Sequence, residues 1–225
     1  MFQEMIRKGK ERGWLLEPEA KELCRGYGLS VGDWRVVNSR KDAENAGDEL
    51  GYPLVMKIVS PDILHKSDVG GVILNIKDSQ GAKEAYGKIE EIKTKTGCML
   101  EGALVEQMAP PGVETIIGAK RDPQFGPVIM FGLGGIFVEV FKDIAFRVAP
   151  LTKYDAMDMI SELKAYVILK GIRGKKPSDI DSIATTLMKV SEMMSSLEEI
   201  AELDFNPTIV YESGYKIVDA RIILK

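Results

Sequence analysis

The stretch PLVMKIVSPDILHKSDVGGVILNIK, residues 53–77, carries the most informative pattern in the chain. Two apolar runs, Leu54–Val59 and Val72–Ile76, predict strands, and the polar segment between them holds the single histidine, His65. Lys57 lies inside the first run, where burial is costly unless its ammonium group meets an anion. A lysine on a strand, followed by a loop that ends in glycine, is an arrangement that can hold a polyphosphate. The stretch therefore predicts a phosphate-binding loop between two strands.

The overall composition is that of an ordinary globular protein. The chain has 225 residues, of which 45% are hydrophobic and 28% charged, and its net charge of -4 gives no electrostatic case for a nucleic-acid partner. The sequence lacks a run of about 18 apolar residues, and its amino terminus lacks the apolar core of a signal peptide. Cys24 and Cys98 match no metal-ligand spacing and indicate reduced thiols. We therefore expect a cytoplasmic protein that binds neither nucleic acid nor a membrane.

Helix and strand signals alternate irregularly along the chain, with hairpin-length links between several strands. This pattern favours an α+β fold with antiparallel sheets over a doubly wound parallel sheet. The segment Ala-Pro-Pro-Gly at 109–112 is the clearest break, and it predicts two lobes, 1–108 and 109–225. The expected helices include 2–12, 42–50, 155–169 and a long helix after Ser178, and the expected strands include 34–37, 104–108, 113–119, 128–131, 137–141 and 145–149.

His65 has two interpretations. A single histidine is more often a structural or surface residue than a catalytic one. Here, however, it stands in a polar loop next to the expected phosphate site, and Gly70 and Gly71 follow it. Imidazole is a nucleophile near neutral pH, and a phosphohistidine divides a difficult transfer into two easier ones. The loop therefore favours, without deciding, a histidine that accepts and returns a phosphoryl group.

The other nucleotide candidates have plain structural interpretations as well. Lys57 can be an edge-strand lysine that reaches water, or its charge can meet the phosphates of a nucleotide. Gly70 and Gly71 can form a simple turn, or they can let backbone amides approach phosphate oxygens. The run at 104–108 can be an interior strand or can offer its backbone to an adenine edge, with Glu106 accepting from a ribose or from the exocyclic amine.

Polar side chains alternate along the extended run near the carboxyl end. Glu202, Asp204 and Asn206 point the same way because successive side chains on a strand alternate between faces. Asp219 follows on the next strand after a hairpin, close enough to converge with them. Such oxygen ligands suit Mg²⁺, which keeps waters and shares its other positions with phosphates. A solvated polar strand face is the alternative, and together with Lys57 the row resembles a site for a magnesium nucleotide.

Five longer motifs stand out along the chain: VMKIVSPDILHKSDVGGV (55–72), GAKRDPQFGPVIMFGLGG (118–135), FRVAPL (146–151), KGIRGKKP (170–177) and ELDFNP (202–207). In this order they resemble the β subunits of ADP-forming acetyl-CoA synthetases, a family of the ATP-grasp superfamily related to succinyl-CoA synthetase. The resemblance implies an ATP-grasp fold, in which two α+β lobes with antiparallel sheets clasp ATP or ADP with Mg²⁺. It also implies a separate CoA-binding α subunit, expected in an α2β2 heterotetramer.

The family reaction implied is acyl-CoA + ADP + phosphate = carboxylic acid + CoA + ATP. In it, a phosphoryl group passes from a histidine of the α subunit to a second histidine on the β subunit and then to ADP. His65 stands at that second position, Asp204 at the acidic residue that stabilises the phosphohistidine, and Glu202 at a helper position. Asn206 and Asp219 match the metal ligands. The implied nucleotide-binding residues are Val55, Lys57, Gly70, Gly71, Val105, Glu106 and Met108, whereas Arg121 and Arg147 match motif positions without an assigned partner.

Two other functions remain open from the sequence. An ATP-grasp carboxylate–amine ligase forms an acyl phosphate directly, does not need His65 and works without an α partner. A non-catalytic nucleotide sensor would bind magnesium nucleotide, yet turnover of its complex would survive the loss of Asn206 or Asp219. Neither the acid used nor the choice between ADP and GDP follows from these residues.

Overall fold

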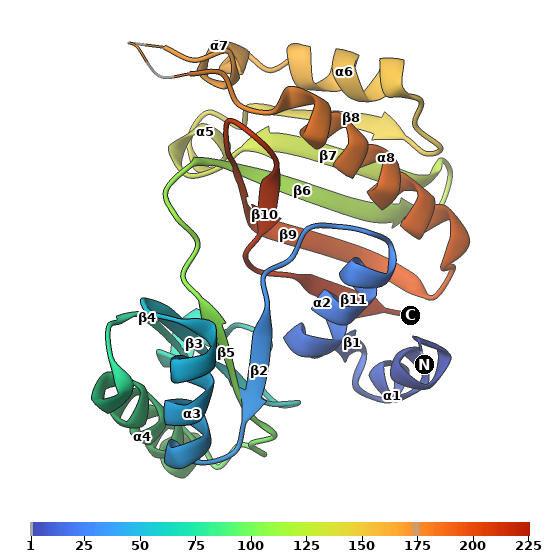
Figure 1. Cartoon of the computed structure of the whole chain (residues 1–225). Coiled ribbons are helices and arrows are strands. Elements are labelled where there is room, and N and C mark those ends of the chain that lie inside the picture. Colours follow the sequence, from blue (N-terminus) through green and yellow to red (C-terminus); the bar gives the residue numbers. More distant parts are fainter. Residues whose placement is uncertain (1, 173, 175) are drawn as a thin grey trace. The chain divides into compact units, whose positions relative to one another are not determined.

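The structure, a computed structural model, describes residues 2–172, 174 and 176–225. The described chain forms two compact units (Figure 1). Unit 1 contains Met1–Leu15, Glu19–Val31 and Pro111–Lys225, and unit 2 contains Leu16–Pro18 and Gly32–Pro110. The last boundary along the chain, between Pro110 and Pro111, falls within the Ala-Pro-Pro-Gly segment.

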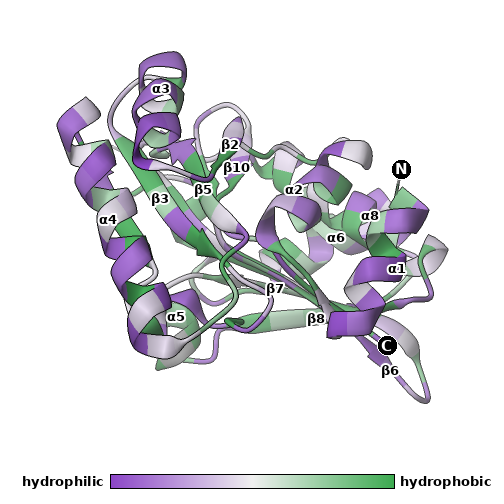
Figure 2. Cartoon of the chain, turned by 90° about the horizontal axis from the view of Figure 1, so that it is seen from below, coloured by the Kyte–Doolittle hydropathy of each residue, from purple (hydrophilic) through white to green (hydrophobic). Residues whose placement is uncertain are grey.

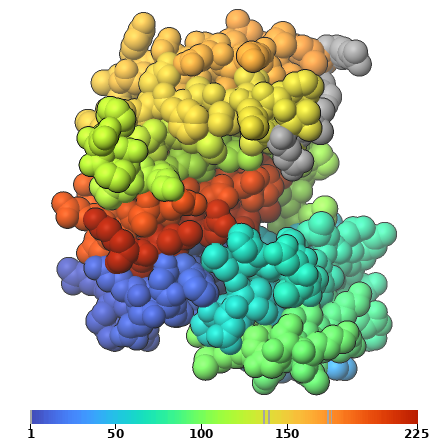
Figure 3. All heavy atoms as spheres, turned by 180° about the vertical axis from the view of Figure 1, so that it is seen from behind, coloured from blue at the N-terminus to red at the C-terminus, as the bar shows by residue number. Residues whose placement is uncertain are grey.

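The division differs from the expected lobes 1–108 and 109–225, because most of the first 31 residues pack in unit 1. Strand β1 (Trp14–Leu15) pairs with β11 (Arg221–Leu224), and helices α1 (Phe2–Arg12) and α2 (Glu17–Gly26) supply core residues such as Ile6 and Leu23. These contacts join segments about two hundred residues apart, which helical periodicity cannot reveal. In Figure 3, the amino-terminal segment accordingly lies against the carboxyl-terminal strands.

In the described chain, unit 1 is built on a seven-stranded sheet in the order β1-β11-β9-β6-β7-β8, with β10 also paired to β9. The named strands pair antiparallel, as expected. One sheet face packs against helices in a core that contains Ile117, Phe131 and Phe205. Its remaining strands are β6 (Val113–Asp122), β7 (Gly126–Leu133), β8 (Ile144–Val148), β9 (Ile200–Val210) and β10 (Tyr215–Ile217).

The helices of unit 1 correct two expectations. Residues 137–141 were expected as a strand, but α5 (Ile136–Glu139) is a short helix, since a brief apolar run does not distinguish the two. The expected helix 155–169 is interrupted and forms α6 (Lys153–Ser161), with a capping box at Thr152, and α7 (Tyr166–Leu169). The long helix is α8 (Ile180–Ser196), capped by Asp179. Part of the motif at 170–177, residues 173 and 175, lies outside the described residues.

Unit 2 contains a four-stranded antiparallel sheet in the order β2-β5-β3-β4. Helices α3 (Arg40–Leu50) and α4 (Ser79–Thr96) pack on one face, where Met56 and Ile58 contribute to the core. Figure 2 shows β3 as a largely hydrophobic strand beside these more polar helices. The strands are β2 (Trp34–Val37), β3 (Leu54–Val59), β4 (Val72–Ile76) and β5 (Gly102–Gln107), and a 3-10 helix, η1 (Lys66–Val69), lies between β3 and β4.

The helix ends of unit 2 follow the sequence signals closely. Ser39 caps α3 by accepting a hydrogen bond from the Asp42 amide, and Asp78 caps α4 by accepting one from the Gly81 amide. Gly97 ends α4 in the left-handed conformation that glycine adopts without steric cost. Across the described chain, we find no helix long and apolar enough to cross a membrane.

Candidate functional site

Lys57 lies on the face of the unit 2 sheet that points away from α3 and α4. Strand alternation places it with Val55 and Val59, while Met56 and Ile58 enter the helix-covered core. The Lys57 side chain is only 4% exposed, and its Nζ lies 2.6 Å from Oε1 of Glu17 and 2.9 Å from Oε1 of Glu106. The anions beside this buried ammonium therefore include two carboxylates of the chain itself.

The His65 loop is fixed at its end and exposed at the histidine. His65 is exposed and immediately precedes η1. Lys66 Nζ lies 2.9 Å from Oε2 of Glu17, the carboxylate that also meets Lys57. Gly70 closes η1 at φ 71°, where a residue without a Cβ avoids strain. The loop thus presents an exposed histidine one residue before Lys66, which meets the same carboxylate as Lys57.

The other expected nucleotide residues divide between the two sheet faces. Glu106 pairs opposite Val55 in the register of β5 with β3, so both share the Lys57 face. Val105 points into the core beneath the helices, and its strand is paired on both sides, with β2 and β3. Met108 is half-buried just after β5, and its amide donates to the carbonyl of Pro53. The side chains of Val55 and Glu106 therefore accompany Lys57, whereas the Val105 side chain does not.

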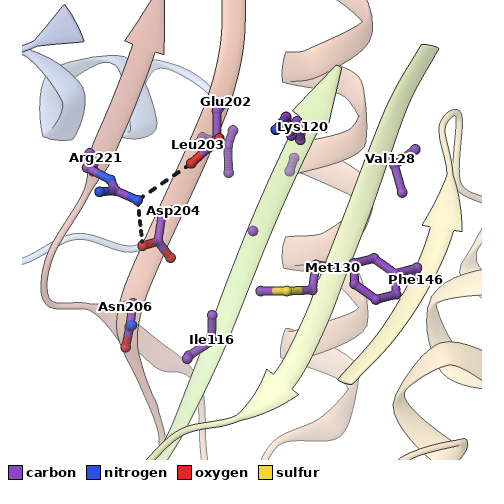
Figure 4. A pocket seen from close by; sticks show the side chains of 12 residues that line it. Ile116, Lys120, Val128, Met130, Phe146, Glu202, Leu203, Asp204, Asn206 and Arg221 are labelled. Atoms are coloured by element: carbon purple, nitrogen blue, oxygen red, sulfur yellow. Dashed lines mark hydrogen bonds and ion pairs between the residues drawn. The ribbon is translucent and has the colours of Figure 1, made fainter. Parts of the chain in front are cut away.

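Unit 1 carries the predicted polar row on the face of its sheet opposite the core. Leu203 and Phe205 are buried, while Glu202, Asp204 and Asn206 line a pocket of about 390 Å³ on the other face (Figure 4). The expected alternation of these side chains along the strand is confirmed, while their role as a site stays a prediction. The pocket is also lined by Ile116, Gly118, Ala119, Lys120, Val128, Met130, Leu203, Phe146 and Arg221.

Arg221 is the member of this site that sequence reasoning missed. Its guanidinium lies 3.3 Å from Oδ2 of Asp204 and 3.5 Å from Oε1 of Glu202, as the dashed lines in Figure 4 mark. The sequence signal that could have identified Arg221 is its position two residues after Asp219. In the structure it lies on β11, which pairs with β9. Burial raises the pKa of the Asp204 carboxyl, while Arg221 lowers it and the nearby Asp219 and Glu202 raise it further. Asp204 therefore holds its proton more readily than an ordinary aspartate.

Asn206 and the more distant Asp219 come together at one end of the row. Arg221 pairs with Asp204, and continuing this antiparallel register by two residues places Asp219 across from Asn206. The amide of Val218 donates to the carbonyl of Pro207 at 3.0 Å, which holds the two segments side by side. An amide oxygen and a carboxylate oxygen are hard donors that fit Mg²⁺.

These two donors fit a metal ion that takes its other ligands from a bound nucleotide and water better than one held by protein side chains alone. Among the described residues, no group of three or more His, Cys, Asp or Glu side chains is placed to hold a metal ion. Asn206 and Asp219 would supply two oxygen ligands to a magnesium ion, and Mg²⁺ commonly takes its other ligands from water and phosphate.

The two motif arginines have structural partners. Arg121 donates to the carbonyls of Met194, Leu197 and Ile200, so it caps the carboxyl end of α8. Arg147 pairs with Asp158 and Glu162, each at 2.6 Å, on and just after α6. Their positions in the motifs therefore reflect folding of unit 1.

Comparison with known proteins is consistent across the whole chain. A family model described as an ATP-grasp domain matches residues 6–224. The chain is 50% identical over 224 residues to the acetate–CoA ligase (ADP-forming) I subunit beta of Pyrococcus furiosus. The aligned segment covers 98% of this chain and 97% of that relative.

Solved structures show the same similarity. The dinucleotide-forming acetyl-coenzyme A synthetase 1 of Ca. Korarchaeum cryptofilum, in complex with coenzyme A, Ca-AMPCP and HgCl+, aligns with a TM-score of 0.95 and 49% identity over 100% of both chains. A selenomethionine form of that protein, with coenzyme A and Mg-AMPPCP and its phosphohistidine segment pointing towards the nucleotide binding site, aligns with a TM-score of 0.88 and 48% identity, again over 100% of both chains.

Proposed function

Because the chain belongs to the family of ADP-forming acetate–CoA ligase β subunits, we propose that it transfers a phosphoryl group between a nucleotide and a partner subunit through His65. The reaction of this family is acyl-CoA + ADP + phosphate = carboxylic acid + CoA + ATP. The observation that carries the assignment to His65 is its placement: an exposed imidazole stands next to Lys66, which shares the Glu17 carboxylate with Lys57.

The proposed transfer balances as two in-line displacements. A nitrogen of His65 takes the phosphoryl group from a phosphohistidine of the partner, so that one P–N bond forms as the other breaks. A terminal oxygen of ADP then attacks the phosphorus, the P–N bond of His65 breaks, and the P–O bond of ATP forms. The imidazole leaves as a neutral group once its other nitrogen carries a proton. Neither displacement changes an oxidation state, so the two steps need no oxidant or reductant.

Residues of unit 2 would bind the nucleotide. Lys57 supports this role because it is a buried cation whose partners are carboxylates, and phosphate oxygens would replace Glu17 or Glu106 beside its ammonium group. We assign Gly70 and Gly71 to the same phosphate site. Their amides donate to the carbonyls of Ser67 and Lys66 in this structure, so contact with phosphate oxygens would replace those hydrogen bonds. Val55 and Glu106 flank Lys57 on the same face, and we assign the adenine to the segment that contains Val105 and ends at Met108, contacted mainly by main-chain atoms.

Residues of unit 1 would supply the acidic part of the site. We assign the metal to Asn206 and Asp219, where bound Mg²⁺ would neutralise charge on the phosphates. We assign to Asp204, with Glu202 as a helper, the role that the family motif implies for them, which is to stabilise the phosphorylated histidine. Arg221 would keep both carboxylates oriented through its ion pairs. Under this assignment the two units correspond to the two lobes of an ATP-grasp fold, with the early segments moved into unit 1.

A partner subunit completes the reaction. The Pyrococcus furiosus relative is named as a beta subunit, and the related solved structures hold coenzyme A. We propose that a CoA-binding α subunit joins this chain in an α2β2 assembly in the cytoplasm.

Replacement of His65 tests the proposal. In the complex with the α subunit, His65→Ala should abolish ATP synthesis from acetyl-CoA, ADP and phosphate, while the binding of magnesium nucleotide, measured by calorimetry, stays close to that of the unchanged protein. Asp68→Ala, an exposed residue of the same loop, serves as the matched control and should retain turnover. Full turnover by His65→Ala would overturn the relay.

A further inference from the structure

The carboxylate of Glu17, in unit 2, forms ion pairs with two lysines, one on strand β3 and one on the 3-10 helix η1. Oε1 of Glu17 lies 2.6 Å from Nζ of Lys57, and Oε2 lies 2.9 Å from Nζ of Lys66. The Glu17 and Lys57 side chains are each 4% exposed, and that of Lys66 is 15% exposed. Charges so shielded from water interact more strongly than surface pairs do. Glu17 therefore couples a residue of β3 to the first residue of η1.

The main chain on the other side of η1 is held to the same strand. The carbonyl of Lys66 accepts from the Gly71 amide at 2.7 Å, and the carbonyl of Gly71 accepts from the Ile58 amide at 2.8 Å. A Cβ at Gly71 would stand 2.5 Å from Cγ2 of Ile58, so the close approach requires glycine. Lys66 is thus held to β3 through its backbone and to Glu17 through its side chain.

His65 lies at the boundary between the held and the accessible parts of this loop. The histidine is exposed, whereas Lys66, the next residue, is the anchored one. A histidine that exchanges a phosphoryl group with two different donors must occupy two positions. An ion pair at the adjacent residue biases the loop toward one of them, the position in which Lys66 meets the carboxylate that also meets Lys57.

We propose that Lys66 is a positioning residue, whose ion pair with Glu17 holds the His65 loop in the state that exchanges phosphoryl groups with the nucleotide. The proposal rests on the proposed function of His65. The ion pair stabilises one loop position, so its loss affects the two half-reactions unequally. Exchange with the nucleotide slows, since the loop is less often in the position that the Lys66–Glu17 pair holds. Exchange with the partner subunit is unaffected or faster, since departure from that position becomes easier.

The half-reactions can be measured separately on the intact complex with the α subunit. Isotope exchange between labelled ADP and ATP reports transfer between His65 and the nucleotide. Labelling of this chain from acetyl-CoA and labelled phosphate, without nucleotide, reports transfer from the partner. The variants are Lys66→Met, which removes the charge at similar length, Lys66→Arg, which retains it, and Lys95→Met as the control. Lys95 is exposed on α4, 3.7 Å from Glu91.

For Lys66→Met, ADP–ATP exchange should fall about tenfold to a hundredfold, the size expected for a mispositioned reacting group. Labelling from acetyl-CoA should persist at an unchanged or higher rate, which also shows that the variant folds. Lys66→Arg should restore most of the exchange, and Lys95→Met should leave both rates unchanged. Equal loss of both half-reactions in Lys66→Met, or no loss in either, would overturn the positioning role. Absence of labelling in the unchanged protein would instead overturn the proposed function, and the positioning role with it.

Discussion

Glu106 lies diagonally across from Lys57 on the neighbouring strand, and its Oε1 is 2.9 Å from the Lys57 Nζ. Glu17, the first residue of α2, approaches the same ammonium. Removing one partner of a buried ion pair is costly because the remaining charge keeps its desolvation penalty. Loss of Lys57 would therefore leave two buried carboxylates without this cation.

The stability of the Lys57 cluster can be tested by urea unfolding. Lys57→Met should lower the free energy of unfolding by about 3–5 kcal/mol, because two buried carboxylates lose a cationic neighbour. The double variant Lys57→Met/Glu106→Gln should recover part of that loss, since one of the uncompensated charges is gone. A double variant less stable than Lys57→Met would contradict the assigned pairing.

Arg121 and Arg147 should contribute very differently to stability. Arg121→Met removes charged hydrogen bonds to three carbonyls at the end of α8 and should lower the free energy of unfolding by about 2–3 kcal/mol. Arg147→Met removes ion pairs with half-exposed carboxylates and should cost about 1 kcal/mol or less. Chemical denaturation of the two matched variants measures both values. A larger loss of unfolding free energy for Arg147→Met than for Arg121→Met would contradict the larger contribution assigned to the Arg121 hydrogen bonds.

Asp204 should make the folded state less stable as the pH rises. Burial raises the pKa of Asp204, so the folded protein binds its proton more tightly than the unfolded chain does. Its contribution to stability is complete below the ordinary aspartate pKa of about 4 and is lost as the pH rises through the raised value. Asp204→Asn should abolish this loss. The free energy of unfolding of the variant, relative to that of the unchanged protein, should therefore increase as the pH rises from the ordinary aspartate pKa through the raised one. Parallel curves from denaturation at several pH values would contradict the raised pKa.

The metal assignment predicts a defect that depends on magnesium. Asn206→Ala and Asp219→Ala should each raise the Mg²⁺ concentration needed for half-maximal ADP–ATP exchange, because each removes one oxygen ligand. Asn45→Ala, an exposed residue on α3, is the control and should leave the magnesium dependence unchanged. Identical magnesium titrations for all three variants would move the metal site elsewhere.

The cysteine at position 24 should be inert in the folded protein. Burial raises the pKa of the Cys24 thiol to about 12, so very little thiolate is present at pH 8. A thiol reagent should modify Cys24 only after unfolding, which mass spectrometry of the peptides can follow. Modification of the native protein at the rate of a free thiol would contradict this burial.

Local patterns predicted the strands and the faces of the site well. The two apolar runs at β3 and β4 were expected with their observed bounds, and the alternation around Leu203 placed Glu202, Asp204 and Asn206 on one face. These features depend on side-chain period and on adjacent turns, which the sequence records directly.

The features that the sequence did not predict depend on contacts between distant segments. The expected anion for Lys57 was a phosphate, yet the carboxylate of Glu17 comes from 40 residues away. Packing of α1 and β1 with the carboxyl-terminal strands likewise has no local signal. The strand expected at 137–141 was wrong for another reason. The four residues of α5 are too few to show a helical or strand period.

The central claim, that His65 carries the phosphoryl group, is tested most directly by locating that group. The complex with the α subunit is incubated with acetyl-CoA and labelled phosphate without nucleotide, and this chain is then digested and sequenced by mass spectrometry. The account predicts one phosphorylated residue, His65, with an acid-labile and base-stable linkage, and release of the label as ATP when ADP and Mg²⁺ are added. A label on a different residue, or a label on His65 that ADP does not remove, would contradict it.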